Sequence, residues 1–222
     1  MTRLKFRWHC LTRRQVIKEV RSEHNALIQV VTVFDKPRLI VGGLLQSGGL
    51  TRKIWSKAVK KLKKKDKKIS EVLILGLGCG DCAFEIRQYY PRAQMLGVEI
   101  DKHIVEAAKC YFNLASVKNL KIAVDDGAKY VERLSKQKKL RLFDLIIVDV
   151  YLGSKMPKPF RTKKFFKMLK KLLGQDGVVV YNHLFFKEHK KRAKGFIKKL
   201  ETVFPEIKLQ RTASNLLIFA SP

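Results

Sequence analysis

The segment EVLILGLGCGDCAFEIRQYYPRAQMLGVEI, residues 71–100, carries the strongest structural signal in the chain. Its opening EVLILGLG predicts a buried strand that ends in glycines, and DCAFEIRQYY (81–90) predicts a helix that stops at Pro91. QMLGVEI (94–100) predicts a second strand. A strand, a helix and a strand in this order are typical of two parallel strands joined by a right-handed crossover. The sequence therefore predicts an α/β protein.

The alternation of strands and helices continues almost to the end of the chain. FDLIIVDV (143–150) is the least ambiguous strand, because its residues are nearly all apolar, as a strand covered on both faces requires. We expect further strands at 120–126, 176–184, 207–211 and 215–221, and further helices at 101–114, 127–134, 160–173 and 186–202. This alternation predicts a mostly parallel, seven-stranded sheet covered by helices.

The N-terminal part of the chain has a different pattern. ALIQVVTVF (26–34) and RLIVGG (38–43) are rich in β-branched and apolar residues, and a turn sequence separates them, so they predict a short β-hairpin module. A basic helix follows and ends near Lys68. We therefore divide the chain into an N-terminal β module (1–50), a basic helix and linker (51–69) and an α/β domain (70–222).

Composition excludes several classes of protein. The 222 residues are 46% hydrophobic, which is enough for a core and excludes a wholly disordered chain. No apolar run approaches the roughly 20 residues of a membrane span, and MTRLKFRWHC lacks the apolar stretch of a secretory signal. Four cysteines in this length do not make a disulfide scaffold. We expect a cytoplasmic protein with no membrane partner.

The chain is strongly basic, with 48 Lys+Arg against 19 Asp+Glu and a net charge of +29. The excess peaks at 53–68, 158–171 and 186–199, where apolar residues recur at helical spacing. Solvated faces of amphipathic helices are the favoured interpretation. A nucleic-acid-binding surface is the main alternative, and we expect any such binding to be weak, independent of sequence and sensitive to salt. A membrane-surface role is a lesser alternative.

Four features point to a ligand site. GLGCG (76–80) follows a strand and opens a helix, where glycines let the backbone turn and the helix N-terminus attracts negative charge. Glu99 ends the next strand, 23 residues after Gly76, where a carboxylate can accept hydrogen bonds from ribose hydroxyls. Asp126 and Asp149 end the two following strands. Strand carboxyl ends share one edge of the sheet, so the set predicts a crevice for an adenosine-type ligand.

The spacing Cys79-Gly80-Asp81-Cys82 also spells C-x-x-C at a helix N-terminus, where a thiolate would be stabilised. A redox role is therefore an alternative, but overlap with the glycine loop explains the spacing better. A second close pair of ligands is missing, because the other cysteines are isolated and the five histidines are scattered. We expect no metal site.

At this point the chain resembles a known family. The stretch 71–184 is similar to the Rossmann-like class I S-adenosylmethionine-dependent transferase (methyltransferase) fold, and within it most of all to spermidine synthase-like proteins. The N-terminal GGLLQS (42–47) resembles the glutamine segment of aminopropyltransferases. The motifs that carry the resemblance, in the family's order, are VLILGLGCG, GVEIDKHIVEAAK, VDDGAKYV, FDLIIVDVY and LLGQDGVVVYN.

The resemblance implies a role for each matching residue. Glu99 would bind the ribose, Asp126 the adenine, and Asp149 would lie near the reactive sulfonium with Tyr151 beside it. Gln46 and Asn182 are weaker candidates for substrate binding. The remaining residues expected around the nucleoside and its methionine-like portion are Gly76, Gly78, Cys79, Gly80 and Gly127.

Two departures from the family pattern affect the reaction. Cys79 stands where aminopropyltransferases have an aspartate in the glycine loop, and Leu152 stands where they have a second aspartate, three residues after Asp149. Both losses weaken the recognition of polyamines, so we expect methyl transfer from S-adenosylmethionine, whose carboxylate can use backbone N–H groups near Gly78. Aminopropyl transfer from decarboxylated S-adenosylmethionine is the alternative. A non-catalytic module that binds nucleoside or nucleic acid is a further one, and a homodimer stays open.

Overall fold

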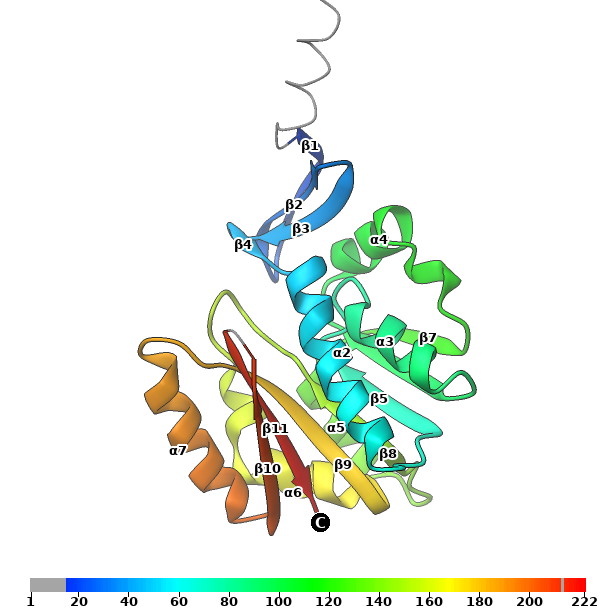
Figure 1. Ribbon diagram of the computed structural model, residues 1–222, viewed down its shortest axis with the longest axis vertical. Coiled ribbons are helices and arrows are strands. Elements are labelled where there is room, and N and C mark those ends of the chain that lie inside the picture. The colour runs from blue at the N-terminus through cyan, green and yellow to red at the C-terminus, as the bar shows by residue number, and fades with distance from the viewer. Residues whose placement is uncertain (1–14, 213) are drawn as a thin grey trace, which may run out of the picture.

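The computed structural model describes residues 15–212 and 214–222 (Figure 1). Its large sheet has seven strands in the order β10-β11-β9-β8-β5-β6-β7. The pairs β5–β6, β6–β7, β5–β8 and β8–β9 are parallel, and β11 pairs antiparallel with both β9 and β10. The strands are β5 Glu71–Leu75, β6 Gln94–Glu99, β7 Leu120–Val124, β8 Phe143–Val148, β9 Leu173–Leu184, β10 Glu206–Arg211 and β11 Asn215–Ser221. The predicted seven-stranded, mostly parallel sheet is confirmed.

Helices cover both faces of this sheet, because side chains alternate along each strand between two apolar cores. One core lies under α2 Gly49–Lys64, α3 Asp81–Tyr89 and α4 Lys102–Tyr111. The other lies under α5 Gly127–Ser135, α6 Lys163–Lys171 and α7 His189–Glu201. The expected helix at 160–173 divides into a 3-10 turn, η2 Lys158–Arg161, and α6, because the Thr162 side chain accepts a hydrogen bond from the N–H of Phe165 and caps α6. A second 3-10 turn is η1 Leu114–Ser116.

The N-terminal module is larger than a hairpin. Its four antiparallel strands are β1 Gln15–Ser22, β2 Ala26–Val33, β3 Lys36–Val41 and β4 Leu44–Leu45. The predicted hairpin is β2–β3, and β1 and β4 add an edge on each side. Both added strands are largely exposed, so they lack the apolar signal on which a sequence prediction rests. The first 14 residues of the predicted module lie outside the described residues.

The N-terminal sheet is tied to the large domain through Asp101, the N-cap residue of α4. The Asp101 carboxylate accepts hydrogen bonds from the Ser22 hydroxyl and, at 2.8 Å, from Nδ2 of Asn25. The basic helix α2 then runs along the large sheet and ends at Lys64 rather than near Lys68. Its buried side chains, Trp55, Val59 and Leu62, confirm that the apolar stripe docks on the core.

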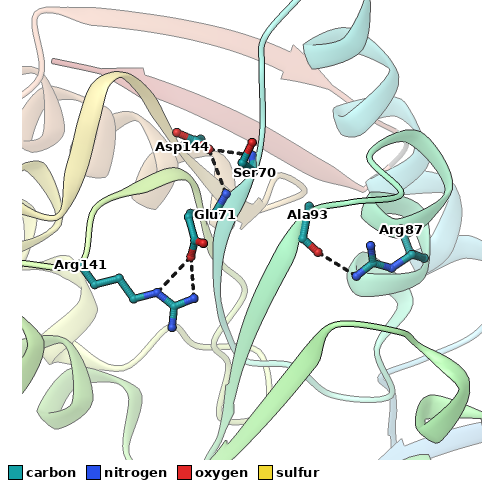
Figure 2. A network of polar contacts seen from close by, with 6 residues as sticks. All are labelled: Ser70, Glu71, Arg87, Ala93, Arg141 and Asp144. Atoms are coloured by element: carbon teal, nitrogen blue, oxygen red, sulfur yellow. Dashed lines mark hydrogen bonds and ion pairs between the residues drawn. The ribbon is translucent and has the colours of Figure 1, made fainter.

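The amino ends of the central strands are held by a polar network (Figure 2). Asp144 accepts hydrogen bonds from the backbone N–H groups of Ser70 (2.7 Å) and Glu71 (2.9 Å), and Arg141 pairs with the Glu71 carboxylate at 2.6 Å. Arg87 of α3 donates to the carbonyl of Ala93 at 2.8 Å, just before β6. These contacts fix the register of β5 and β8 at the sheet edge opposite the cleft described below. In the described part of the chain, no helix combines the length and apolar character needed to cross a bilayer.

Candidate active site

A cleft of about 520 Å³ opens at the carboxyl ends of β5, β6, β7 and β8. The glycine loop after β5 lines one part of it, and Glu99, Asp126 and Asp149 come from the next strand ends. The N-terminal module supplies a wall that includes Leu45 and Gln46. The structure therefore brings together the features that the sequence analysis assigned to one crevice.

The glycine loop requires glycine at its turns. Gly76, Gly78 and Gly80 have φ angles of 81°, 53° and 84°, a region that favours glycine. A Cβ on Gly76 would lie 2.2 Å from the carbonyl oxygen of Asp149, so the close approach of β5 and β8 also depends on the absence of a side chain. The loop passes directly into α3, whose N-terminus faces the cleft at Asp81 and Cys82.

Glu99 is buried at the cleft and its carboxylate is held from both sides. One oxygen accepts the N–H of Gly78 at 2.9 Å and the other accepts the N–H of Asp101 at 3.3 Å. Burial raises the pKa of Glu99, and these backbone hydrogen bonds oppose the shift. The Gly78 N–H is therefore engaged by Glu99, and the expectation that a ligand carboxylate uses backbone N–H groups near Gly78 stays a prediction for the neighbouring groups.

Asp126 and Gly127 form the start of α5 at the cleft. One oxygen of the Asp126 side chain accepts the N–H groups of Ala128 (2.8 Å) and Lys129 (3.1 Å) and so caps the helix. A Cβ on Gly127 would lie 3.4 Å from the ring of Phe160, which also lines the cleft. The cap and a ligand contact are compatible, because a carboxylate has a second oxygen.

Asp149 is half-buried and lies at the centre of a polar network. Its Oδ2 accepts a hydrogen bond from the indole Nε1–H of Trp55 at 3.1 Å, and its Oδ1 accepts one from Nδ2 of Asn182 at 2.9 Å. Asn182 in turn accepts Nδ2 of Asn215 at 2.8 Å. Burial raises the pKa of Asp149 to about 6, while the bonds from Asn182 and Trp55 act in the opposite direction. A carboxyl group with this pKa can accept and release a proton near neutral pH.

Tyr151 lies at the cleft, and its hydroxyl is hydrogen-bonded to the backbone. Its hydroxyl donates to the backbone carbonyl of Asn182 at 2.8 Å and accepts the N–H of Leu184 at 3.0 Å. Burial raises the pKa of Tyr151. The hydroxyl thus joins the loop after β8 to the end of β9, and the ring lines the cleft. A substrate contact of Tyr151 stays a prediction, and Asn182 contacts the Asp149 carboxylate.

The two positions that depart from the family pattern both line the cleft. Cys79 is 3% exposed, and burial raises its pKa, as it does that of Cys82. Both thiols are free, and their burial opposes the thiolate that a redox role requires. Leu152 is 49% exposed at the rim. Among the described residues no cluster of His, Cys, Asp and Glu is arranged to hold a metal ion.

Two residues of the site were missed as site residues. Trp55 has the spacing of a core residue, and nothing in that spacing indicates that its N–H reaches Asp149. Asp81 lines the cleft, accepts the N–H of Gly48 at 3.2 Å and has its pKa raised by burial. The position of Asp81 directly after the glycine loop is the signal in the sequence that could have identified it as a cleft residue.

The charge of the cleft is opposite to that of the chain. Five carboxylate residues line it, whereas none of the described lining residues is Lys, Arg or His. In a chain of net charge +29, this separation concentrates negative potential in one cavity. The five are Asp81, Glu99, Asp125, Asp126 and Asp149.

The strand order and the cleft at the strand carboxyl ends define a Rossmann-like class I methyltransferase fold. Spermidine synthase from Thermotoga maritima shares it with a TM-score of 0.75 at 19% identity, over 93% of this chain and 72% of that one. Human methyltransferase-like protein 13, solved in complex with SAH, has a TM-score of 0.64 at 23% identity, over 78% of this chain and 82% of that one. The chain belongs to the spermine/spermidine synthase domain family, whose model matches residues 53–214.

Curated relatives include both kinds of transferase. An eEF1A lysine and N-terminal methyltransferase homolog of Drosophila melanogaster is 30% identical over 158 residues, which are 68% of this chain and 23% of that protein. A probable polyamine aminopropyl transferase of Bifidobacterium longum is 32% identical over 113 residues, which are 51% of this chain and 24% of that protein. The chain thus spans about a quarter of the length of these two relatives.

Proposed function

We propose that this protein transfers a methyl group from S-adenosylmethionine to an amine nitrogen. The observation that carries the proposal is the cleft, whose described lining has five carboxylates and no basic residue, with Asp149 half-buried among them. An amine acceptor is cationic at neutral pH, and such a cavity attracts it even though the rest of the surface repels cations. Relatives named as eEF1A lysine and N-terminal methyltransferases support the same class of acceptor.

The residues of the cleft fit the nucleoside co-substrate. Glu99 and Asp126 each keep acceptor capacity beyond the backbone bonds they make, and apolar side chains such as Leu77, Ile100 and Phe160 provide walls for a base. S-adenosylmethionine, when bound, supplies a methyl carbon activated by the positive sulfonium sulfur. The orphan N–H groups of the first turn of α3 are suited to its carboxylate.

The protein has little covalent chemistry to perform. The acceptor ammonium first gives up a proton, and the lone pair this frees forms a bond to the methyl carbon while the carbon–sulfur bond breaks. The thioether leaves as S-adenosylhomocysteine. Asp149, with its pKa of about 6, is the group we assign to accept that proton before the bond forms. Trp55 and Asn182 orient the Asp149 carboxylate, since each donates to one of its oxygens.

Aminopropyl transfer to a polyamine is the second candidate, because the same acidic cleft suits a polycation. Calorimetry with S-adenosylmethionine and its decarboxylated form separates the two, and it should be followed by transfer assays with lysine-containing peptides and with putrescine. We expect S-adenosylmethionine to bind at least as tightly and methylated peptide to form. Tighter binding of the decarboxylated form, with spermidine formed from putrescine, would reverse the assignment, and no product with either acceptor would favour a non-catalytic module.

The position of Leu152 allows a sharper test of this choice. Leu152→Asp places a carboxylate at the exposed rim where aminopropyltransferases have one, and Leu152→Asn is the matched neutral control. We expect the aspartate variant to gain affinity for putrescine and the asparagine variant to gain none. Equal affinity of both variants for putrescine would show that the absence of a carboxylate at this position does not decide acceptor choice.

A further inference from the structure

A second cavity lies beside the cleft, and its charge is the reverse. It has a volume of about 480 Å³ and is formed by three segments: the loop and 3-10 turn after β8, the end of β9, and one side of α7. Tyr151 and Ser154 line both cavities. Of the eleven described residues that line it, six are basic or histidine and none is acidic. The six are Lys155, Arg161, His183, His189, Arg192 and Lys199.

The four permanent cations of this cavity are not neutralised within the described chain. None of Lys155, Arg161, Arg192 and Lys199 has a carboxylate within 4.0 Å among the described residues. Glu188 is nearby, but its Oε1 contacts His189 Nε2 at 3.4 Å and its side chain is 60% exposed. Four like charges around one cavity repel one another, and an anion between them removes that repulsion.

The inner surface of the cavity is built and partly buried. His183 and His189 are 6% and 4% exposed. The His183 Nδ1 lies 2.8 Å from the Leu184 carbonyl, and its ring packs against Phe196 with centroids 5.4 Å apart. Burial lowers the pKa of His183. Guanidinium groups, ammonium groups and imidazoles around an aromatic wall are the donor set that phosphate groups prefer.

We propose that this cavity binds a small molecule that carries two or more phosphate groups, of the size of a nucleoside diphosphate. The volume lies in the range of pockets for small ligands, and the cations come from separate segments that converge on it. Arginine at two positions favours phosphate, because a guanidinium can donate two parallel hydrogen bonds to it. This site is separate from the proposed transfer reaction and does not depend on it.

The test uses calorimetry of the full chain with inorganic pyrophosphate and with ADP as probes. The pocket variant is Arg161→Gln with Arg192→Gln, and the matched control is Lys60→Gln with Lys64→Gln, which removes the same charge from exposed positions on α2. We expect one site per chain, with affinity reduced at least about tenfold in the pocket variant and nearly unchanged in the control. Equal weakening in both variants, or several equivalent sites, would overturn the proposal.

A steric variant separates the cavity from its charge. Gly195 lines the cavity within α7, and a Cβ built there meets no atom within 4 Å. Gly195→Leu is therefore expected to fold, since leucine is the better helix former, and to block the site with no charge removed. Its thermal unfolding checks the fold. Unchanged pyrophosphate binding in this folded variant would refute the cavity as the site, as would RNA binding that depends on Arg161 and Arg192 without binding of either probe.

Discussion

The indole nitrogen of Trp55 donates a hydrogen bond to the carboxylate of Asp149, over 3.1 Å and across 94 residues of sequence. Trp55 is 1% exposed and belongs to α2, whereas Asp149 follows β8. The contact gives the basic helix a role beyond covering the sheet, because it positions the carboxylate that we assign as the proton acceptor. It also restrains the pKa of Asp149, which burial raises.

The first prediction concerns the pH dependence of transfer. Asp149 accepts a proton only when ionised. A plot of log kcat/KM against pH should therefore rise with a slope of one below about pH 6 and level off above it. Asp149→Asn should lower kcat about a hundredfold or more, with Asp176→Asn at an exposed position as the control. Steady-state rates between pH 5 and 8.5 measure both. A fully active Asp149→Asn variant would rule out the role.

The second prediction concerns stability. The pKa of Asp149 is raised in the folded state, from 3.8 to about 6, so the folded state disfavours the ionised form. Protonated Asp149 therefore contributes to the free energy of unfolding below about pH 4. This contribution, at most about 3 kcal/mol, is lost as pH rises through about 6. Urea unfolding should therefore show wild type losing stability relative to Asp149→Asn over this interval. A difference in free energy of unfolding between the two proteins that stays constant with pH would contradict the raised pKa of Asp149.

The third prediction isolates the hydrogen bond from Trp55. Trp55→Phe removes the donor while keeping an aromatic ring, so the apparent pKa in the rate profile should move upward by roughly half a unit to one unit. Ile54→Val, at a cleft residue without such a bond, is the control and should leave the profile in place. A downward movement in the tryptophan variant would show that the bond does not stabilise the carboxylate.

The fourth prediction concerns the nucleoside site. Glu99→Ala removes the proposed ribose acceptor and leaves the N–H groups of Gly78 and Asp101 without it, so the affinity for S-adenosylhomocysteine should fall by about 1–3 kcal/mol. Glu99→Gln keeps one acceptor oxygen and should lose less. Glu106→Ala, an exposed carboxylate on α4, should bind as wild type does. Calorimetry that finds equal affinity in all of them would remove Glu99 from the site.

The fifth prediction concerns the basic face of α2. Lys61 lies over the ring of Phe219 and Lys63 over that of Tyr90, at 4.5 and 5.6 Å from the ring centroids, so these two lysines have contacts in the fold. Lys60, Lys64 and Lys65 are exposed. Replacing these three by glutamine should reduce the slope of log binding constant against log salt concentration, for weak duplex binding, by at most about 3. It should leave S-adenosylhomocysteine binding intact. A tight complex with one RNA at physiological salt, lost in this variant, would indicate an RNA acceptor.

The sequence by itself determined the layers of the fold and the edge at which the cleft lies. Hydrophobic periodicity is a local property, so each of the seven strands and the helices between them could be located within a few residues. The glycine loop and the acids Glu99, Asp126 and Asp149 follow successive strands. Parallel strands must place such residues at one edge, and the convergence therefore followed from the order of elements alone.

Only the tertiary structure decided which partners these residues have. The bond from Trp55 to Asp149 and the engagement of the Tyr151 hydroxyl join segments far apart in the chain, and no spacing encodes them. The edge strands β1 and β4 escaped prediction because they bury little apolar surface. The opposite charges of the two cavities also arise from folding, since a net charge describes the chain as a whole and burial distributes its sign among separate surfaces.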